Sequence, residues 1–124
     1  MTVGFAAAIV NGWLDGTFAT ATCYAKLHVG DPGAAGANNA AAGDTTRKQA
    51  TMAAAAGGSK SASASVGPWT NGGATEALSH ISLWTAAAAG TYNASAALTG
   101  GGSWASGYTC TLTTLTISIT PIAA

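Results

Sequence analysis

The first residues of the chain carry apolar side chains at helical spacing. Alanines at positions 6–8 add helix propensity, and Gly16 is a residue at which a helix can end. Gly12 weakens the pattern without breaking it. We therefore predict a short amphipathic α-helix within residues 1–17, starting near Thr2, whose apolar face carries Phe5, Ile9, Trp13 and Leu14.

From residue 22 onward apolar and polar residues alternate in short runs, and this period of two is typical of half-buried strands. Glycines separate the runs, with Gly57-Gly58 as a predicted hairpin turn and residues 100–102 as a predicted break. We place strands at residues 22–29, 46–54, 59–66, 76–84, 90–98, 108–112 and 114–119. The pattern predicts a mainly β chain, with an antiparallel β-sandwich or jelly-roll-like domain at 22–120 behind the helix. The length of 124 residues fits a single domain over 1–124.

A long segment without periodicity follows the first predicted strand. Asp31, Pro32 and Gly33 favour a tight turn, and glycine, alanine and asparagine dominate the residues that come after it. We expect a surface loop over residues 30–45 that reaches a neighbouring subunit instead of packing on its own domain. A flexible, solvated loop is the alternative.

Charged residues make up 6% of the chain, against about 25% in typical soluble domains. Four bases and four acids cancel, and no basic stripe appears, so we expect no nucleic-acid partner. Residues 3–14 are the most apolar stretch near the start, but they are too few for a membrane span and lack the basic start of a signal peptide. We therefore expect no membrane association. We expect the protein to be assembled in a bacterial cytoplasm.

Large apolar side chains are few, because alanine supplies much of the hydrophobic fraction of 48%. A fully buried large side chain contributes roughly 1.5–3 kcal/mol, and an alanine contributes much less. We expect a thin core in the isolated domain and a stability that depends on assembly, most simply as a homotrimer.

The residue types that carry chemistry do not gather in recognisable motifs. His28 and His80 lack the close spacing to Cys23 and Cys110 that zinc sites use. The chain also lacks a nucleophile elbow, a carboxylate pair and a phosphate-binding loop. We expect no enzyme activity, no catalytic residues, no metal and no cofactor. The cysteines are expected to be buried thiols, with a disulfide as the open alternative.

Partner contacts are the remaining role for the unusual residues. Trp69 and Trp104 stand in glycine-rich segments and are expected in loops that contact a partner. Arg47 and Lys48 are adjacent, so in a strand they point to opposite faces and one of them should face a partner. The candidate interface comprises Phe5, Ile9, Trp13, Leu14, Asp31, Pro32, Arg47, Lys48, Trp69 and Trp104.

Several segments together resemble a known family. Residues 27–36 fit the pattern L-H-x-G-D-P-G-x-x-G, and residues 79–84 (SHISLW) resemble the strand T-H-F-S-L-W. Residues 45–49 (TTRKQ), 69–71 (WTN) and 115–121 follow in the matching order. The chain thus resembles small virion proteins of tailed phages that infect actinobacteria. The resemblance implies a structural role in the virion and supplies no catalytic residues.

Three hypotheses follow from the residues and the resemblance. The first is a capsid decoration (cement) protein, a minor capsid protein that forms a homotrimer and binds the major capsid protein or other virion proteins. The second is a minor tail or tail-fibre-associated protein. The third is a host-glycan-binding module displayed on the virion, with Trp69 and Trp104 as its contacts. All three place the protein in the virion.

Overall fold

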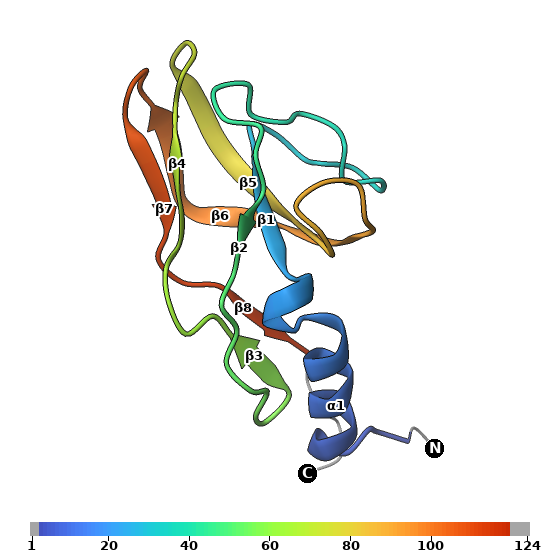
Figure 1. The fold of residues 1–124 in the computed structure, drawn as a ribbon. Helices are drawn as coiled ribbons and strands as arrows, with labels where there is room; N and C mark the ends of the chain where they lie inside the picture. Colours follow the sequence, from blue (N-terminus) through green and yellow to red (C-terminus); the bar gives the residue numbers. More distant parts are fainter. Residues whose placement is uncertain (1–2, 120–124) are drawn as a thin grey trace.

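The computed structural model describes residues 3–119, which are mainly β with one α-helix at the N-terminal end (Figure 1). Helix α1 spans Ala7–Thr17, and a 3₁₀ turn follows at Thr20–Thr22. The strands are β1 (Tyr24–His28), β2 (Lys48–Gln49), β3 (Ser59–Ser61), β4 (Val66–Thr70), β5 (Glu76–Trp84), β6 (Tyr92–Trp104), β7 (Thr109–Leu112) and β8 (Thr116–Ser118). The predicted class, mainly β and antiparallel with a short N-terminal helix, is confirmed.

The described strands form a four-stranded sheet in the order β2-β1-β5-β6 and two ribbons, β3-β8 and β4-β7. Figure 1 shows the β4-β7 ribbon beside the larger sheet, and α1 next to β3 and β8 at one end of the molecule. Residues from the larger sheet, from the β4-β7 ribbon and from the connecting segments meet in one core. The core comprises Cys23, Ala25, Leu27, Ala41, Ala50, Val66, Trp69, Leu78, Ile81, Leu83, Trp104 and Leu115.

The centre of the larger sheet is the pairing of β1 with β5, in which every residue of β1 has a Cα partner. Ala25 and Leu27 turn into the core, as the alternation predicted, whereas His28 lies on the opposite face. That opposite face is also covered, because His28 itself has no exposed surface.

The strand predicted over residues 46–54 is reduced to β2, because this segment changes partners along its length. The N–H of Ala50 donates to the carbonyl of Cys23 at 2.9 Å, and the N–H of Ala53 donates to the carbonyl of Ser61 at 2.9 Å. A segment that passes from one sheet to another cannot keep a continuous ladder. The prediction was therefore wrong in extent.

The strand predicted over residues 59–66 is also wrong in extent. The chain divides here into β3, which pairs with β8, and β4, which pairs with β7. Trp69 was expected in a loop, but it lies in β4 and is fully buried. Glycine and proline beside it are accommodated by an irregular register between Val66 and Trp69, so they do not end the strand.

The glycines at 100–102 do not end β6, contrary to the prediction. Leu78 pairs with Gly102 and His80 pairs with Ala97, so residues 98–101 stand opposite the single residue Ser79. Gly100 has a φ of 75°, a conformation that glycine adopts at little cost. The glycines build a bulge at which β6 bends (Figure 1).

Helix α1 begins at Ala7 instead of near Thr2, so Phe5 precedes the helix. Val10 and Leu14 are buried and form the face that packs on the body. Beside them, the side-chain oxygen of Asn11 accepts the N–H of Gly58 at 2.8 Å. One face of the helix is thus anchored to the turn before β3.

An ion pair completes this attachment. The Nζ of Lys60 lies 2.6 Å from Oδ1 of Asp15, and Lys60 is 5% exposed while Asp15 is 45% exposed. The same carboxylate accepts the N–H of Ala55 at 2.9 Å. The hydrogen bond from Lys60, followed by the one from Ala55, lowers the pKa of Asp15.

Removal of the acid should destabilise the protein more than removal of the base. In Asp15→Ala the buried Lys60 ammonium loses its partner, whereas Lys60→Met replaces the ammonium with an apolar side chain. We expect a lower Tm for Asp15→Ala than for Lys60→Met in thermal unfolding at neutral pH. The double variant should resemble Lys60→Met, and an Asp15→Ala protein as stable as the parent would contradict the role of the pair.

The segment after β1 folds back on its own domain. The N–H of Val29 donates to the carbonyl of Asn39 at 2.8 Å, and the N–H of Ala41 donates to the carbonyl of Leu27 at 3.1 Å. Ala41 belongs to the core. The expectation that this loop reaches out instead of packing on its own domain is therefore wrong, because its backbone finds hydrogen-bond partners along β1.

His28 lies beneath this loop with both ring nitrogens hydrogen-bonded. Nδ1 donates to the carbonyl of Asn38 at 2.8 Å, which leaves Nε2 to accept the hydroxyl of Ser82 at 2.7 Å. Ser82 in turn accepts the indole N–H of Trp84 at 2.7 Å. These directions are those of neutral His28, and burial favours that form because it lowers the pKa of His28.

The neutral histidine should make stability fall in mild acid. Below about pH 6.5 the unfolded chain binds a proton at His28 that the folded chain does not, so the free energy of unfolding decreases as pH falls. We expect denaturant unfolding to show this loss between about pH 7 and pH 5, with a slope of at most about 1.4 kcal/mol per pH unit for one proton.

Two histidine variants separate this effect from general acid sensitivity. His28→Asn should flatten the pH dependence over this range, whereas the control His80→Asn should keep it. Equal slopes in the parent and His28→Asn would show that the buried imidazole is not responsible.

Candidate interaction surfaces

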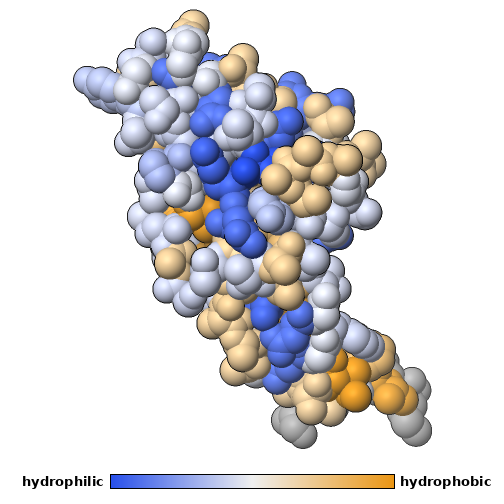
Figure 2. Space-filling model, in the orientation of Figure 1, coloured by the Kyte–Doolittle hydropathy of each residue, from blue (hydrophilic) through white to orange (hydrophobic). Residues whose placement is uncertain are grey.

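The largest exposed apolar side chains near the helix gather at one end of the molecule. Val3, Phe5, Ile9 and Trp13 are 79%, 54%, 52% and 47% exposed, and we call these four residues the apolar end. The rings of Phe5 and Trp13 meet edge to face, with centroids 4.9 Å apart. Figure 2 shows hydrophobic surface at the end where α1 lies. Leu14, predicted on the same face, is 1% exposed and packs inward instead.

Arg47 is held by its own chain. Its Nη1 donates to the carbonyls of Ala86, at 3.0 Å, and Ala89, and its guanidinium carbon lies 3.8 Å from the ring centroid of Trp84. Partial burial lowers the pKa of Arg47. Arg47 was a candidate for a partner contact, but the loop after β5 of the same chain supplies its acceptors. Lys48 is half-buried in β2.

Asp31 and Pro32 build the loop in which they stand. The carboxylate of Asp31 accepts the N–H of Gly33 at 2.9 Å, and the carbonyl of Pro32 accepts the N–H of Asn38 at 2.9 Å. Pro32 is buried. The loop closes on itself through these bonds, and their ordinary role is structural.

The two tryptophans expected in partner loops are buried. The indole N–H of Trp69 donates to the carbonyl of Thr46 at 3.0 Å. Trp104 ends β6 and is 4% exposed, but its indole nitrogen has no hydrogen-bond partner. Glycine-rich surroundings predicted exposure for both residues, and packing of β4 and β6 into the core overrides that local signal.

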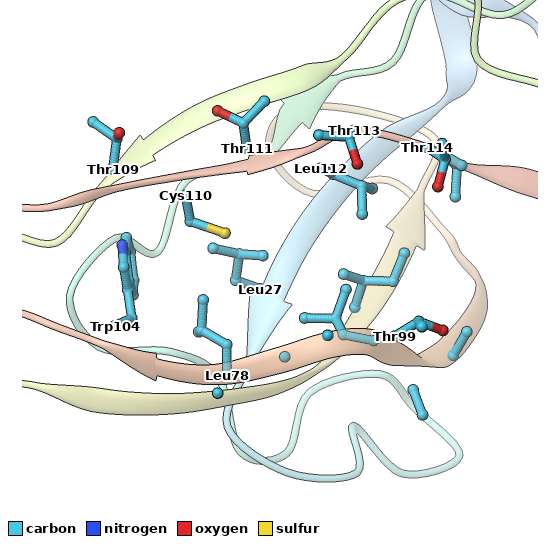
Figure 3. Close-up of a pocket in the computed structure, with 18 of the residues that line it drawn as sticks. Leu27, Leu78, Thr99, Trp104, Thr109, Cys110, Thr111, Leu112, Thr113 and Thr114 are labelled. Atoms are coloured by element: carbon cyan, nitrogen blue, oxygen red, sulfur yellow. The ribbon is translucent and has the colours of Figure 1, made fainter.

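A cleft of about 530 Å³ opens between β6 and β7 (Figure 3). Leu27, Leu78 and Ile81 give part of its lining an apolar character, and polar atoms contribute about as much surface. Figure 3 shows Cys110 and Leu112 pointing from β7 into this space, while Thr109 and Thr111 point away from it. A second hollow of about 160 Å³ shares part of this lining and extends the cleft toward β8.

The two cysteines are free thiols, and Cys23 is buried as expected, whereas Cys110 is only partly buried. Burial raises the pKa of Cys23 to about 11 and also raises the pKa of Cys110, so neither thiol is activated as a nucleophile. Among residues 3–119 no cluster of three or more metal-ligating side chains occurs. No helix in the described part of the chain is long and apolar enough to cross a membrane.

The sequence analysis missed the cleft and the polar side chains that fasten the loops. Asn71 is 1% exposed, and its amide nitrogen donates to the carbonyls of Ala74 and Trp104 at 2.9 and 2.8 Å. An asparagine before two glycines suggested only a turn. A sequence signal for the irregular strand beside the cleft was the run of three glycines at residues 100–102, because glycine within a strand often marks a bulge.

Comparison with known proteins adds one finding. The family described as podophage GP4 fiber I protein gp80 matches residues 1–120, and no curated protein matches the chain. The match agrees with the resemblance in placing the chain in a phage virion, and it favours the tail or tail-fibre hypothesis over capsid decoration. Because the match covers almost the whole chain, the protein belongs to the podophage GP4 fiber I protein gp80 family of phage tail fibre proteins.

Proposed function

We propose that the protein is a non-enzymatic structural subunit of a phage tail fibre that associates with further copies of itself through its apolar end. The observation that carries this proposal is the exposure of Val3, Phe5, Ile9 and Trp13 at one end of the chain. The family match supplies the fibre context.

An apolar end of this kind is typical of a contact surface. Trp13 and Phe5 are aromatic residues that commonly anchor interfaces, and Ile9 lies one helical turn from Trp13. The acid of the same helix, Asp15, is directed to Lys60 in the body of the protein. Burial of this surface would therefore desolvate apolar side chains without breaking an ion pair.

Self-association also suits the composition of the chain. Alanines occupy core positions 25, 41 and 50, where larger side chains would contribute more burial energy. A fibre subunit that is folded when it docks gains stability from each contact by mass action. A homotrimer is the simplest closed assembly that we propose, with other virion proteins as additional partners.

The location is tested on purified particles. Immunogold labelling with an antibody against this chain should mark the tail, and cryo-EM of the same particles should place the domain in a fibre. Label distributed over the capsid would contradict the fibre assignment and would favour the capsid decoration hypothesis.

Loss of the apolar end should weaken self-association. Removal of one buried large side chain forfeits roughly 1.5–3 kcal/mol, which corresponds to about a 10- to 100-fold weaker association. We expect this loss for Trp13→Ser and Ile9→Asp in analytical ultracentrifugation, with an unchanged Tm for the monomer.

Tyr108→Ser is the matched control, because Tyr108 is 69% exposed and lies outside the apolar end. Its association should equal that of the parent. An effect of the same size in all three variants would indicate non-specific adhesion instead of a defined contact.

A further inference from the structure

We propose that the cleft between β6 and β7 receives the N-terminal segment Val3–Ala6 of a second copy, which adds as a strand. This inference deepens the proposed self-association and rests on it. It assigns the acceptor surface for part of the apolar end.

The first observation is the pair of open strand edges beside the cleft. β6 pairs with β5 and β7 pairs with β4, and within residues 3–119 neither has a partner strand on its other side. Such edges present rows of backbone N–H and C=O groups that readily pair with another chain. β6 is the longest strand described, so it offers an extended template.

The second observation is that β6 lacks two of the features that usually block strand addition. Residues 92–104 contain no charged residue and no proline. The bulge at residues 98–101 bends β6, and its residues form part of the cleft wall. The bulge therefore borders the proposed binding site and does not fill it.

The third observation is the chemistry of the cleft. Apolar and polar atoms contribute about equally to its lining, with Leu27, Leu78 and Ile81 as the apolar residues on the sheet side and Leu112 on the opposite side. Threonine, serine and glycine complete the lining, and no charged side chain contributes to it among the described residues. The occupant should therefore be uncharged and carry apolar side chains on one face.

The fourth observation is the unsatisfied indole of Trp104. This residue lines the cleft, is 4% exposed, and its Nε1 has no acceptor. A buried donor without a partner costs about 1–3 kcal/mol, so an occupant that supplies an acceptor gains affinity. A backbone carbonyl of an added strand is such an acceptor. In Figure 3 the indole stands between the two strands that border the cleft.

The segment Val3–Ala6 matches this site. It precedes α1, and Ala6 has extended dihedral angles with ψ 149°. In an extended chain Val3 and Phe5 project to the same side, and both are largely exposed in their own subunit. Figure 1 shows the segment leaving the body at the end where α1 lies, away from β6 and β7, so the cleft it enters belongs to another copy.

The resulting contact joins two different surfaces, which makes it heterologous. Repetition of such a contact produces a ring if the rotation closes and an open filament if it does not. A ring of three copies would be the homotrimer proposed above.

A saccharide is the other ligand that hydroxyl-lined walls and an indole N–H could suit. The two unpaired backbone edges favour a peptide strand, because a sugar ring would leave both edges unpaired. Saccharide binding is therefore one outcome of the test below.

The test uses the native thiol of Cys110, which points into the cleft (Figure 3). Val3→Cys and Phe5→Cys are prepared separately in the full chain and oxidised with diamide, which takes two electrons and two protons as each disulfide forms. The reaction is run at about pH 9, because burial raises the pKa of Cys110. We expect covalent dimers and higher multimers with at least one variant, joined through Cys110 and lost when Cys110→Ser is added.

Val29→Cys is the matched control, because Val29 is also an exposed apolar residue but lies outside the apolar end. Equal cross-linking by this control, or no Cys110-dependent cross-link in either test variant, would overturn the proposal.

A second variant separates this inference from the proposed function. Ala96→Glu places a carboxylate in the cleft at an exposed position of β6, and Ala88→Glu places one in the loop after β5. We expect at least about tenfold weaker association for Ala96→Glu only, with both variants equally stable. If Ala96→Glu associates as strongly as the parent and the protein is still located on the tail, the cleft proposal is wrong. The proposed role in the fibre would not be affected by that result. A further outcome concerns alkylation of the Cys110 thiol. If added host cell-wall saccharide slows this alkylation and self-association does not, the occupant of the cleft is a glycan and the strand proposal is overturned.

Discussion

The antiparallel pairing of β1 with β5 is the interaction on which the other parts of this domain depend. Its inner face supplies Ala25, Leu27, Ile81 and Leu83 to the core. Its outer face carries the hydrogen-bonded chain from His28 to Ser82 and on to Trp84, against which the loop over residues 30–41 folds. The β1-β5 pair thus supplies apolar side chains to the core on one face and hydrogen-bonded polar side chains beneath the loop on the other.

The chain has few charged residues. Most of those that form hydrogen bonds do so with backbone groups of loops. Glu76 accepts the N–H groups of Ala42 and Gly43 at 2.8 and 3.2 Å, and Arg47 donates to carbonyls in the loop after β5. Asp15 and Lys60 hold the helix. Because these four charged side chains have partners inside the subunit, they contribute little to the surfaces that remain for other chains. Assembly should therefore depend on burial and on backbone hydrogen bonds more than on ion pairs.

Among the candidate partner residues, the expected exposure is found for Phe5, Ile9 and Trp13, which lie in or beside the helix. Trp13 and Leu14 are neighbours, so about 100° of helix rotation separates them, and the same apolar stripe supplies one exposed and one buried residue. For Trp69 and Trp104 the local signals of glycine and proline indicated loops. Their burial depends on β7 and β5, which lie elsewhere in the sequence.

The sequence by itself determined the elements with a strong local period: α1 by its apolar spacing, and β1, β5 and β8 by alternation, because a repeat of side-chain polarity needs no knowledge of the partner. It also determined the scarcity of charge and of large apolar side chains. Only the tertiary structure decided that residues 46–54 change partners, that the glycines of β6 form a bulge, and that β6 and β7 leave a cleft between them. These features follow from which strand edges meet across long stretches of chain, and edge pairing is a non-local choice that side-chain periodicity does not encode.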